Sequence, residues 1–113
     1  MTRIRIKTSE DLLFLQNDEI YAVVNGEEFV FSLSTVRRIF LLMAGPKPYC
    51  TDWGLAVEVD PDTAIFIMAD HHCFKPFLFD QLGKVLPIDY QRVIDAMERP
   101  VGMVEIGSVN YSV

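Results

Sequence analysis

The stretch EIYAVVNGEEFVFS, residues 19–32, decides the class of fold that this chain of 113 residues adopts. Asn25 and Gly26 separate two runs rich in β-branched and aromatic residues, and both tolerate the positive φ of a two-residue type I′ turn. The stretch therefore predicts a β-hairpin. Its expected cross-strand pairs, counted outward from the turn, are Val24 with Glu27, Ala22 with Phe29, and Ile20 with Phe31. Because both faces of this hairpin are largely apolar, we expect it to lie well inside a sheet.

A second hairpin is predicted in LAVEVDPDTAIFIMA, residues 55–69. Apolar and polar residues alternate in its first arm, Pro61 presets a tight turn, and the returning arm is apolar on both faces. Two single strands flank the hairpins. The stretch TRIRIK, residues 2–7, alternates isoleucine with basic residues in the manner of an edge strand. The stretch VGMVEI, residues 101–106, indicates a last strand that returns to the sheet.

Helices are predicted between these strands. Ser9 can cap a short helix over residues 9–16, and residues 34–44 carry an apolar stripe at helical spacing that Gly45 and Pro46 end. The members of this stripe are Val36, Ile39, Phe40 and Met43. Proline suits the first turn of a helix, so Pro76 can open a third one. A fourth is capped by Asp89, and its apolar stripe consists of Tyr90, Val93, Ile94 and Met97.

Together these elements predict an α+β fold in a single domain over residues 1–113. We expect a mainly antiparallel sheet of about five to six strands, made of two hairpins and flanking strands, with two to three helices packed on one face. Residues 45–54 hold two prolines and two glycines, so we expect an exposed loop there. Half of the residues are apolar, which is enough for a core without disulfide or metal staples.

The charge of the chain is acidic and unevenly spread. Sixteen acidic residues stand against ten basic ones, for a formal net charge of −6, which argues against a general nucleic-acid binder. Six acids and no base lie between Lys7 and Arg37, and five acids and no base lie between Lys47 and Lys75. The acidic residues of these two segments either keep turns and strand edges soluble or form an acidic face for a basic partner.

Short apolar runs predict the compartment. The longest, residues 39–44 and 64–69, fall far below the length of a membrane span, so we expect no membrane association. The first residues, MTRIRIK, lack the apolar block of a secretory signal. We therefore expect a cytoplasmic protein in which Cys50 and Cys73 are free thiols.

The stretch ADHHCFKP brings together residue types that can bind zinc or catalyse a reaction. His71, His72 and Cys73, with Cys50, match the ligands that zinc accepts. On an extended chain, however, neighbouring side chains point to opposite faces, so we expect neither a metal ion nor catalytic residues here. In that interpretation Cys73 ends a buried strand, and the histidines lie at a wet rim or pair with Asp70. A metal site or a cysteine enzyme built on these residues is the alternative.

The tetrapeptide Asp70–Cys73 resembles the signature of the DHHC protein acyltransferases, in which the cysteine carries the acyl group. Those enzymes are multi-pass membrane proteins with a cysteine-rich zinc-binding domain, and this chain has neither the spans nor the cysteines. We attribute the match to coincidence. The sequence also has no phosphate-binding glycine loop, no nucleotide fingerprint and no GxSxG elbow. We therefore expect no cofactor and no enzymatic activity.

The stretch CFKPFLF crowds Phe74, Phe77, Leu78 and Phe79 into one segment. A one-sided short helix cannot bury all four, so we expect that some of them form the interface of a homodimer.

These observations favour a small protein-binding module, such as an inhibitor, an immunity protein or a phage anti-defence protein, that acts on a partner with a basic surface. Carboxylates steer association with such a partner, and aromatic side chains anchor it. The expected partner-binding residues are Glu27, Glu28, Tyr49, Trp53, Asp60 and Asp62. The alternatives are a small Cys/His-based enzyme or metal-binding protein, and a structural homo-oligomer without a ligand.

Overall fold

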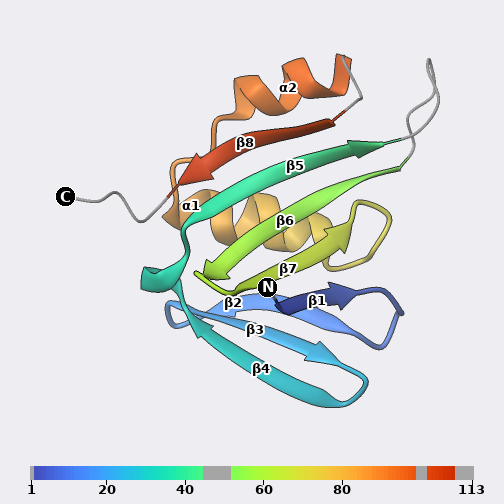
Figure 1. Cartoon of the computed structure of the whole chain (residues 1–113), viewed down its shortest axis with the longest axis vertical. Coiled ribbons are helices and arrows are strands. Elements are labelled where there is room, and N and C mark those ends of the chain that lie inside the picture. The colour runs from blue at the N-terminus through green and yellow to red at the C-terminus, as the bar shows by residue number, and fades with distance from the viewer. Residues whose placement is uncertain (1, 45–51, 99–101, 109–113) are drawn as a thin grey trace.

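The computed structural model describes residues 2–44, 52–98 and 102–108, and eight strands in these ranges form two sheets (Figure 1). The larger sheet has five strands in the order β1-β7-β6-β5-β8. Their bounds are β1 (Thr2–Ile6), β5 (Arg38–Ala44), β6 (Asp52–Asp60), β7 (Thr63–Met68) and β8 (Gly102–Ser108). The smaller sheet has the order β2-β3-β4, with β2 (Leu12–Gln16), β3 (Glu19–Val24) and β4 (Glu27–Ser32). The α+β class is confirmed. We expected a single sheet, but the strands form two sheets.

Strand β1 forms one edge of the larger sheet, as the sequence predicts. Ile4 and Ile6 are buried, and Arg3 and Arg5 point to the other side and are exposed. Its partner β7 runs parallel to it, whereas the other pairs of this sheet are antiparallel. The predicted last strand is confirmed as β8, which pairs with β5 at the other edge.

Both predicted hairpins are confirmed. Asn25 and Gly26 have φ of 53° and 79°, the left-handed conformation of a type I′ turn, and the register of β3 and β4 is the expected one. Strands β6 and β7 form the second hairpin, with Pro61 in its turn. The first hairpin does not lie inside the larger sheet. It belongs to the three-stranded sheet, in which β2 pairs with the free edge of β3 and β4 forms an edge of the sheet.

The segment after Ser9 is strand β2 and not the predicted helix. Leu13 is buried while Leu12 is exposed, so the side chains alternate between faces as in a strand. Asn17 and Asp18, both with positive φ, turn the chain directly into β3. A helix this short has a costly nucleus, whereas pairing with β3 satisfies the backbone along the whole segment.

The predicted helix over residues 34–44 is also wrong, because Arg38–Ala44 form β5 in the interior of the larger sheet. An unbroken apolar run contains helical spacings by chance, and pairing with β6 on one edge and β8 on the other selects a strand here. The helical part is limited to a 3₁₀ turn, η1 (Leu33–Thr35), which Ser32 caps. Trp53, expected in an exposed loop, lies in β6 and is half-buried.

The structure contains fewer helices among its described residues than the two to three that the sequence predicts. A π-helix, η2 (Pro76–Leu82), begins at the predicted proline and continues into one turn of α-helix, α1 (Gly83–Val85). Within the described ranges only α2 (Tyr90–Glu98) is an α-helix of more than one turn. Its predicted cap is confirmed, since the Asp89 carboxylate accepts the Arg92 backbone N–H at 3.1 Å. No helix among the described residues is long and apolar enough to cross a membrane.

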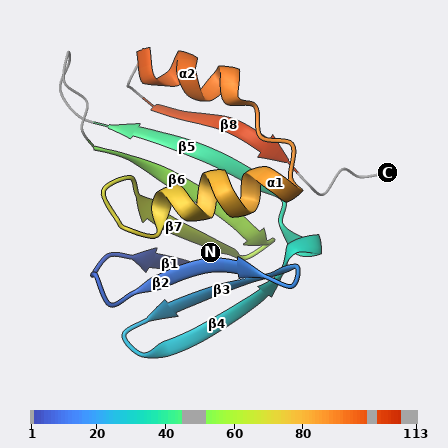
Figure 2. The same ribbon diagram turned by 180° about the vertical axis from the view of Figure 1, so that it is seen from behind.

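The core lies between the two sheets and the η2–α1 segment, which crosses one face of the larger sheet (Figure 2). Two rows of buried side chains run across that face in register: Ile4, Ile65, Val57 and Ile39, then Ile6, Ile67, Leu55 and Leu41. The helical segment adds Phe77, Leu78 and Leu82, and the smaller sheet adds Leu13, Ile20 and Ala22. The other face of each sheet points outward, and these two outward faces carry most of the candidate functional surface.

Candidate functional site

The outward face of the three-stranded sheet, named here the small-sheet face, is an apolar surface with an acidic rim. Cross-strand neighbours place its side chains side by side: Leu12 beside Val23, and Phe14 beside Tyr21 and Val30. Leu12 and Val30 are 39% and 44% exposed, and the other three are half-buried. Glu19 and Glu28 belong to the same face, because they alternate with the inward residues of β3 and β4.

Phe14 and Tyr21 form the centre of this face. Their rings stack with centroids 5.0 Å apart and planes 7° from parallel. The Tyr21 hydroxyl donates to the Glu19 carboxylate at 3.3 Å. Desolvation, followed by the charges of Glu19 and Glu28, raises the pKa of Tyr21. The phenol therefore stays neutral and lies within the field of both carboxylates.

The predicted contact residues at the hairpin tip point to opposite sides. Glu28 is paired with Val23 and points outward, onto the small-sheet face, whereas Glu27 is paired with Val24. Glu27 lines a groove of about 410 Å³ between the hairpin and β1, together with Arg3 and Arg5. The two carboxylates thus stand in different electrostatic surroundings, although they are neighbours in the sequence.

Asp11 fixes the position of the hairpin tip. Its side chain is buried and accepts three backbone N–H groups, from Lys7 at 2.9 Å, Thr8 at 3.0 Å and Asn25 at 3.3 Å. The hydrogen bonds from Lys7 and Thr8 lower the pKa of Asp11 from 3.8 to about 2. One carboxylate therefore joins the β1–β2 turn to the β3–β4 turn.

The remaining predicted contacts are not part of this site. Asp60 and Asp62 lie at the β6–β7 turn, where the Asp60 side chain accepts the Asp62 N–H at 2.8 Å. This turn adjoins the start of β1 through a hydrogen bond from Thr2 N–H to the Asp62 carbonyl, whereas Asp11 adjoins its end. A five-residue strand separates the two acidic groups by roughly 15 Å. Trp53 packs edge-to-face on Phe74 at 4.9 Å, on the inner side of the sheet. Tyr49 and Cys50 lie outside the described residues.

The outward face of the five-stranded sheet, the large-sheet face, has a rim of mixed charge, because Arg5 stands at its β1 edge and Glu105, the partner of Phe40, stands at its β8 edge. Phe40, Ala56, Phe66 and Arg5 lie in one row across it, and Met68 is 40% exposed nearby. The Arg38 guanidinium lies 5.1 Å from the centre of the Phe40 ring. It also forms a two-pronged ion pair with Glu58, at 2.7 and 3.2 Å.

The histidine–cysteine cluster is a compact group at a turn. Residues 69–73 leave β7 without continuing as a strand, so the extended geometry on which the sequence argument depended is not present. His71, His72 and Cys73 each offer a ligand atom, and these atoms lie within 4.8 Å of one another. The rings of the two histidines stack with centroids 4.5 Å apart.

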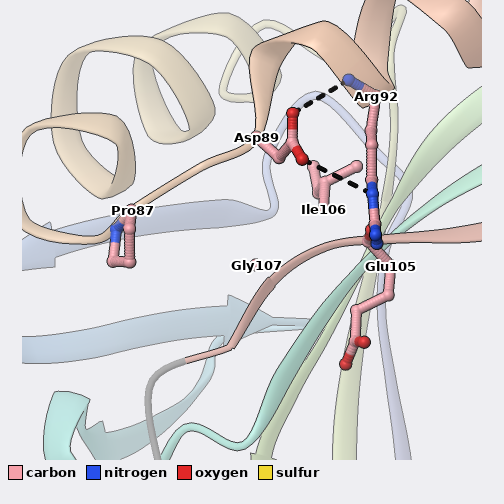
Figure 3. Close-up of a pocket in the computed structure, with 6 residues that line it drawn as sticks. All are labelled: Pro87, Asp89, Arg92, Glu105, Ile106 and Gly107. Carbon is pink, nitrogen blue, oxygen red and sulfur yellow. Dashed lines mark hydrogen bonds and ion pairs between the residues drawn. The ribbon is translucent and has the colours of Figure 1, made fainter.

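A small pocket of about 250 Å³ lies between α2 and β8 (Figure 3). Its charged groups bind one another: the Asp89 carboxylate contacts the Arg92 side chain at 3.4 Å, and Arg92 donates to the Glu105 carbonyl at 3.1 Å. The Asp89 N–H donates to the Ile106 carbonyl at 2.7 Å. These contacts attach the start of α2 to the edge strand, which is a structural role.

Comparison with known proteins adds no relative: no protein family, no curated protein and no solved structure matches this chain.

Sequence reasoning missed the apolar part of the small-sheet face. The sequence predicts a helix for Leu12 and Phe14, and it predicts burial for both apolar faces of the first hairpin. The alternation of LLFLQ, followed by the turn-forming pair Asn17-Asp18, is the signal that indicates a third strand. With that strand in place, one face of the sheet has no neighbour to cover it.

Proposed function

We propose that this chain is a small protein-binding module that uses the small-sheet face to bind a partner with a basic surface, as an inhibitor, an immunity protein or an anti-defence protein does. The observation that carries the proposal is the coincidence, on one face, of the stacked Phe14 and Tyr21 with the carboxylates of Glu19 and Glu28. Protein interfaces have this anatomy, with an apolar aromatic centre inside a polar rim.

The acidic rim supports the choice of a basic partner. Glu19 and Glu28 flank the apolar centre from two strands, so an arginine or lysine beside the centre meets a carboxylate on either side. Complementary charge of this kind speeds association and selects among partners. Glu28 is thus kept from the predicted contacts, and Glu27 becomes the residue that tests the geometry, since it points to the other side.

Rigidity of the hairpin tip also supports a binding role. The bonds of Asp11 to Thr8 and Asn25 hold the tip against the body of the protein. A contact surface that is ordered before association loses less conformational entropy on binding. The small-sheet face therefore suits a partner that it meets without rearrangement.

The experiment has two stages. The intact chain is used to purify its partner from the native cell, mass spectrometry identifies the partner, and binding kinetics are then measured with the purified pair. Val30→Lys places a positive charge in the apolar centre and should weaken binding at least tenfold, because it removes apolar contact and repels a basic surface.

Met68→Lys is the matched control, since Met68 is exposed to a similar degree on the large-sheet face. It should leave the affinity within about twofold. A partner whose affinity falls with Met68→Lys and not with Val30→Lys contradicts the proposal.

Self-association is the second candidate, and it has an observation of its own. Phe74, Phe77 and Leu78 are buried in the core, but Phe79 is 40% exposed and stacks on Tyr90 at 6.1 Å. Exposed Ile94 and Val85 lie on the same two helical segments. Light scattering during gel filtration measures the mass. A homodimer that becomes a monomer with Phe79→Glu supports this candidate, and a monomer at all concentrations removes it.

A further inference from the structure

We propose that His71, His72 and Cys73 bind a transition-metal ion, with zinc as the expected occupant. The inference is independent of the small-sheet face. It depends on three observations: the side chains converge at a turn, both histidines are oriented by backbone carbonyls, and the spacing of sulfur and nitrogen fits a tetrahedral ion.

The orientation of the imidazoles determines which nitrogen is available. Nε2 of His71 lies 2.7 Å from the Thr8 carbonyl, and Nε2 of His72 lies 2.9 Å from the Ser9 carbonyl. A carbonyl only accepts, so each Nε2 carries the proton and donates. In the neutral rings Nδ1 then holds the lone pair. Metal-binding histidines are oriented in this way, with the remote N–H donating to a carbonyl or carboxylate.

The Cys73 sulfur lies at a distance from the His72 nitrogen that allows both atoms to bind one zinc ion. Sγ of Cys73 is 3.6 Å from Nδ1 of His72. A tetrahedral zinc ion with a sulfur ligand at about 2.3 Å and a nitrogen ligand at about 2.0 Å holds the two atoms roughly 3.6 Å apart. His72 and Cys73 thus form a nitrogen–sulfur pair that accepts the ion with little movement.

His71 supplies the third ligand after a small change. Its Nδ1 accepts the Cys73 N–H at 3.1 Å, and the three ligand atoms lie within 4.8 Å of one another. To bind, Nδ1 gives up that N–H, and the stacked rings shift so that the three ligand atoms approach one another. Water takes the fourth position, because His72 is exposed and Cys73 is only half-buried.

The proton balance of binding is simple. The zinc ion loses coordinated water, the thiol of Cys73 loses its proton to solvent, and one Zn–S and two Zn–N bonds form. Both histidines keep the Nε2 proton. Binding therefore releases about one proton per ion and weakens as the pH falls.

Asp11 holds the turn that carries the Thr8 and Ser9 carbonyls. It accepts the backbone N–H groups of Lys7 and Thr8, and its own N–H donates to the Thr8 carbonyl at 3.1 Å. That carbonyl is the one that orients His71. The turn that holds both histidines is therefore itself held by a buried carboxylate.

The test uses the full chain freed of metal by a chelator and titrated with zinc chloride and with cobalt chloride. We expect one equivalent to bind, a thiolate-to-cobalt charge-transfer band to appear, and the melting temperature to rise with zinc. Cys73→Ser should abolish the band. His72→Ala should weaken zinc binding at least tenfold, since changes even in outer-shell partners cost tenfold or more.

Two variants serve as controls. Cys50→Ser removes the other thiol and should keep both the band and the affinity. Asp70→Asn changes the neighbouring carboxylate and should also keep them. Circular dichroism of the metal-free variants verifies that Cys73→Ser and His72→Ala are folded.

Three results of the titrations overturn the proposal: no binding at one equivalent, a band that survives Cys73→Ser, or a band that disappears with Cys50→Ser. Rapid alkylation of Cys73 that depends on His72, in a chain that takes up no zinc or cobalt, also overturns it. That result assigns the pair as a thiol and its base.

Discussion

The two outward sheet faces are built alike and charged differently. Each carries two aromatic rings among partly exposed apolar side chains, Phe14 and Tyr21 on the small-sheet face and Phe40 and Phe66 on the large-sheet face. On the small-sheet face the flanking charges are carboxylates. On the large-sheet face they are mixed: Arg5 flanks Phe66, Glu105 flanks Phe40, and Arg38 is paired with Glu58.

The centres of the two faces also differ in shape. Large side chains fill the centre of the small-sheet face, where the two rings lie in contact. The centre of the large-sheet face holds Gly54, Ala56 and Ala64, and a side chain at Gly54 would lie 2.5 Å from the Ile67 carbonyl oxygen. Ala56 keeps Phe40 and Phe66 apart. A similar β pattern therefore produces an aromatic anchor on one side and a flat surface with separate rings on the other.

A net charge of −6 is thus a poor guide to either face. Glu19 and Glu28 flank the aromatic anchor of the small sheet, whereas Arg5 and Arg38 belong to the large-sheet face. A partner is selected by the local sign of the charge, since exposed charges beyond about 10 Å are screened in salt.

The largest expected effect tests whether one core supports both faces. Phe77 is fully buried on η2, within the cluster that joins both sheets. Phe77→Ala should lower the free energy of unfolding by about 3–5 kcal/mol. Urea unfolding is followed by Trp53 fluorescence for the large sheet and by amide exchange of β3 for the small sheet.

Phe79→Ala, on the same segment but 40% exposed, is the control and should change stability by less than about 1 kcal/mol. Separate unfolding transitions of the two sheets in the Phe77 variant would show that the two faces do not depend on one common core.

The second prediction separates the faces by affinity. Tyr21→Ala should weaken partner binding about 30-fold, or about 2 kcal/mol, because it removes one ring of the stacked pair. Phe66→Ala removes a half-buried ring from the large-sheet face and should change affinity less than threefold. Isothermal titration measures both, and melting temperatures show whether stability is affected equally. Equal losses of affinity would mean that the partner does not bind the small-sheet face in preference to the large-sheet face.

The third prediction sharpens the comparison to two neighbouring residues. Glu28→Lys should slow association roughly tenfold at low salt and reduce its salt dependence, because Glu28 points onto the small-sheet face. Glu27→Lys, on the other side of the strand, should change the rate much less. Stopped-flow mixing at several salt concentrations measures this difference. Equal rates for the two variants would show that only net charge steers association.

The smallest expected effect concerns Asp11, which joins the β1–β2 turn to the β3–β4 turn. The folded pKa of Asp11, about 2, lies below its ordinary value of 3.8, so the carboxylate stabilises the fold above pH 4 and this contribution is lost as the pH falls toward 2. In Asp11→Asn the amide oxygen can replace only one carboxylate oxygen, so the 3.3 Å bond from Asn25 is the one lost. The variant should be slightly less stable at pH 6 and equal to the parent near pH 2. Melting curves across this range measure it, and a constant gap between the two proteins contradicts the assignment.

Prediction from the sequence was reliable for hairpins and poor for apolar runs. The register around Asn25 followed from the turn, because two residues with positive φ leave a single way to pair the arms. Residues 38–44 were assigned to a helix, since an unbroken apolar run has no period of its own. Burial between β6 and β8 made that run a strand.

The candidate sites show the same division. The place of Glu28 beside a turn predicts it as a contact residue, but its separation from Glu27 onto another face is visible only in the sheet. The expectation of no site at the histidine cluster depends on an extended chain there, whereas residues 69–73 form a turn. The carbonyl partners of the histidines, Thr8 and Ser9, lie 63 residues away in the chain, beyond the reach of any local pattern.

What the sequence determined by itself is local: the turn at Asn25-Gly26, the turn at Pro61, the start of η2 at Pro76 and the cap at Asp89. Each depends on the φ preference or side chain of one or two residues. Tertiary structure decided the rest: the parallel pairing of β1 with β7, the faces left open, and the meeting of two turns at the histidines. Such contacts depend on the burial that distant segments provide for one another, and that burial exists only when the chain is folded.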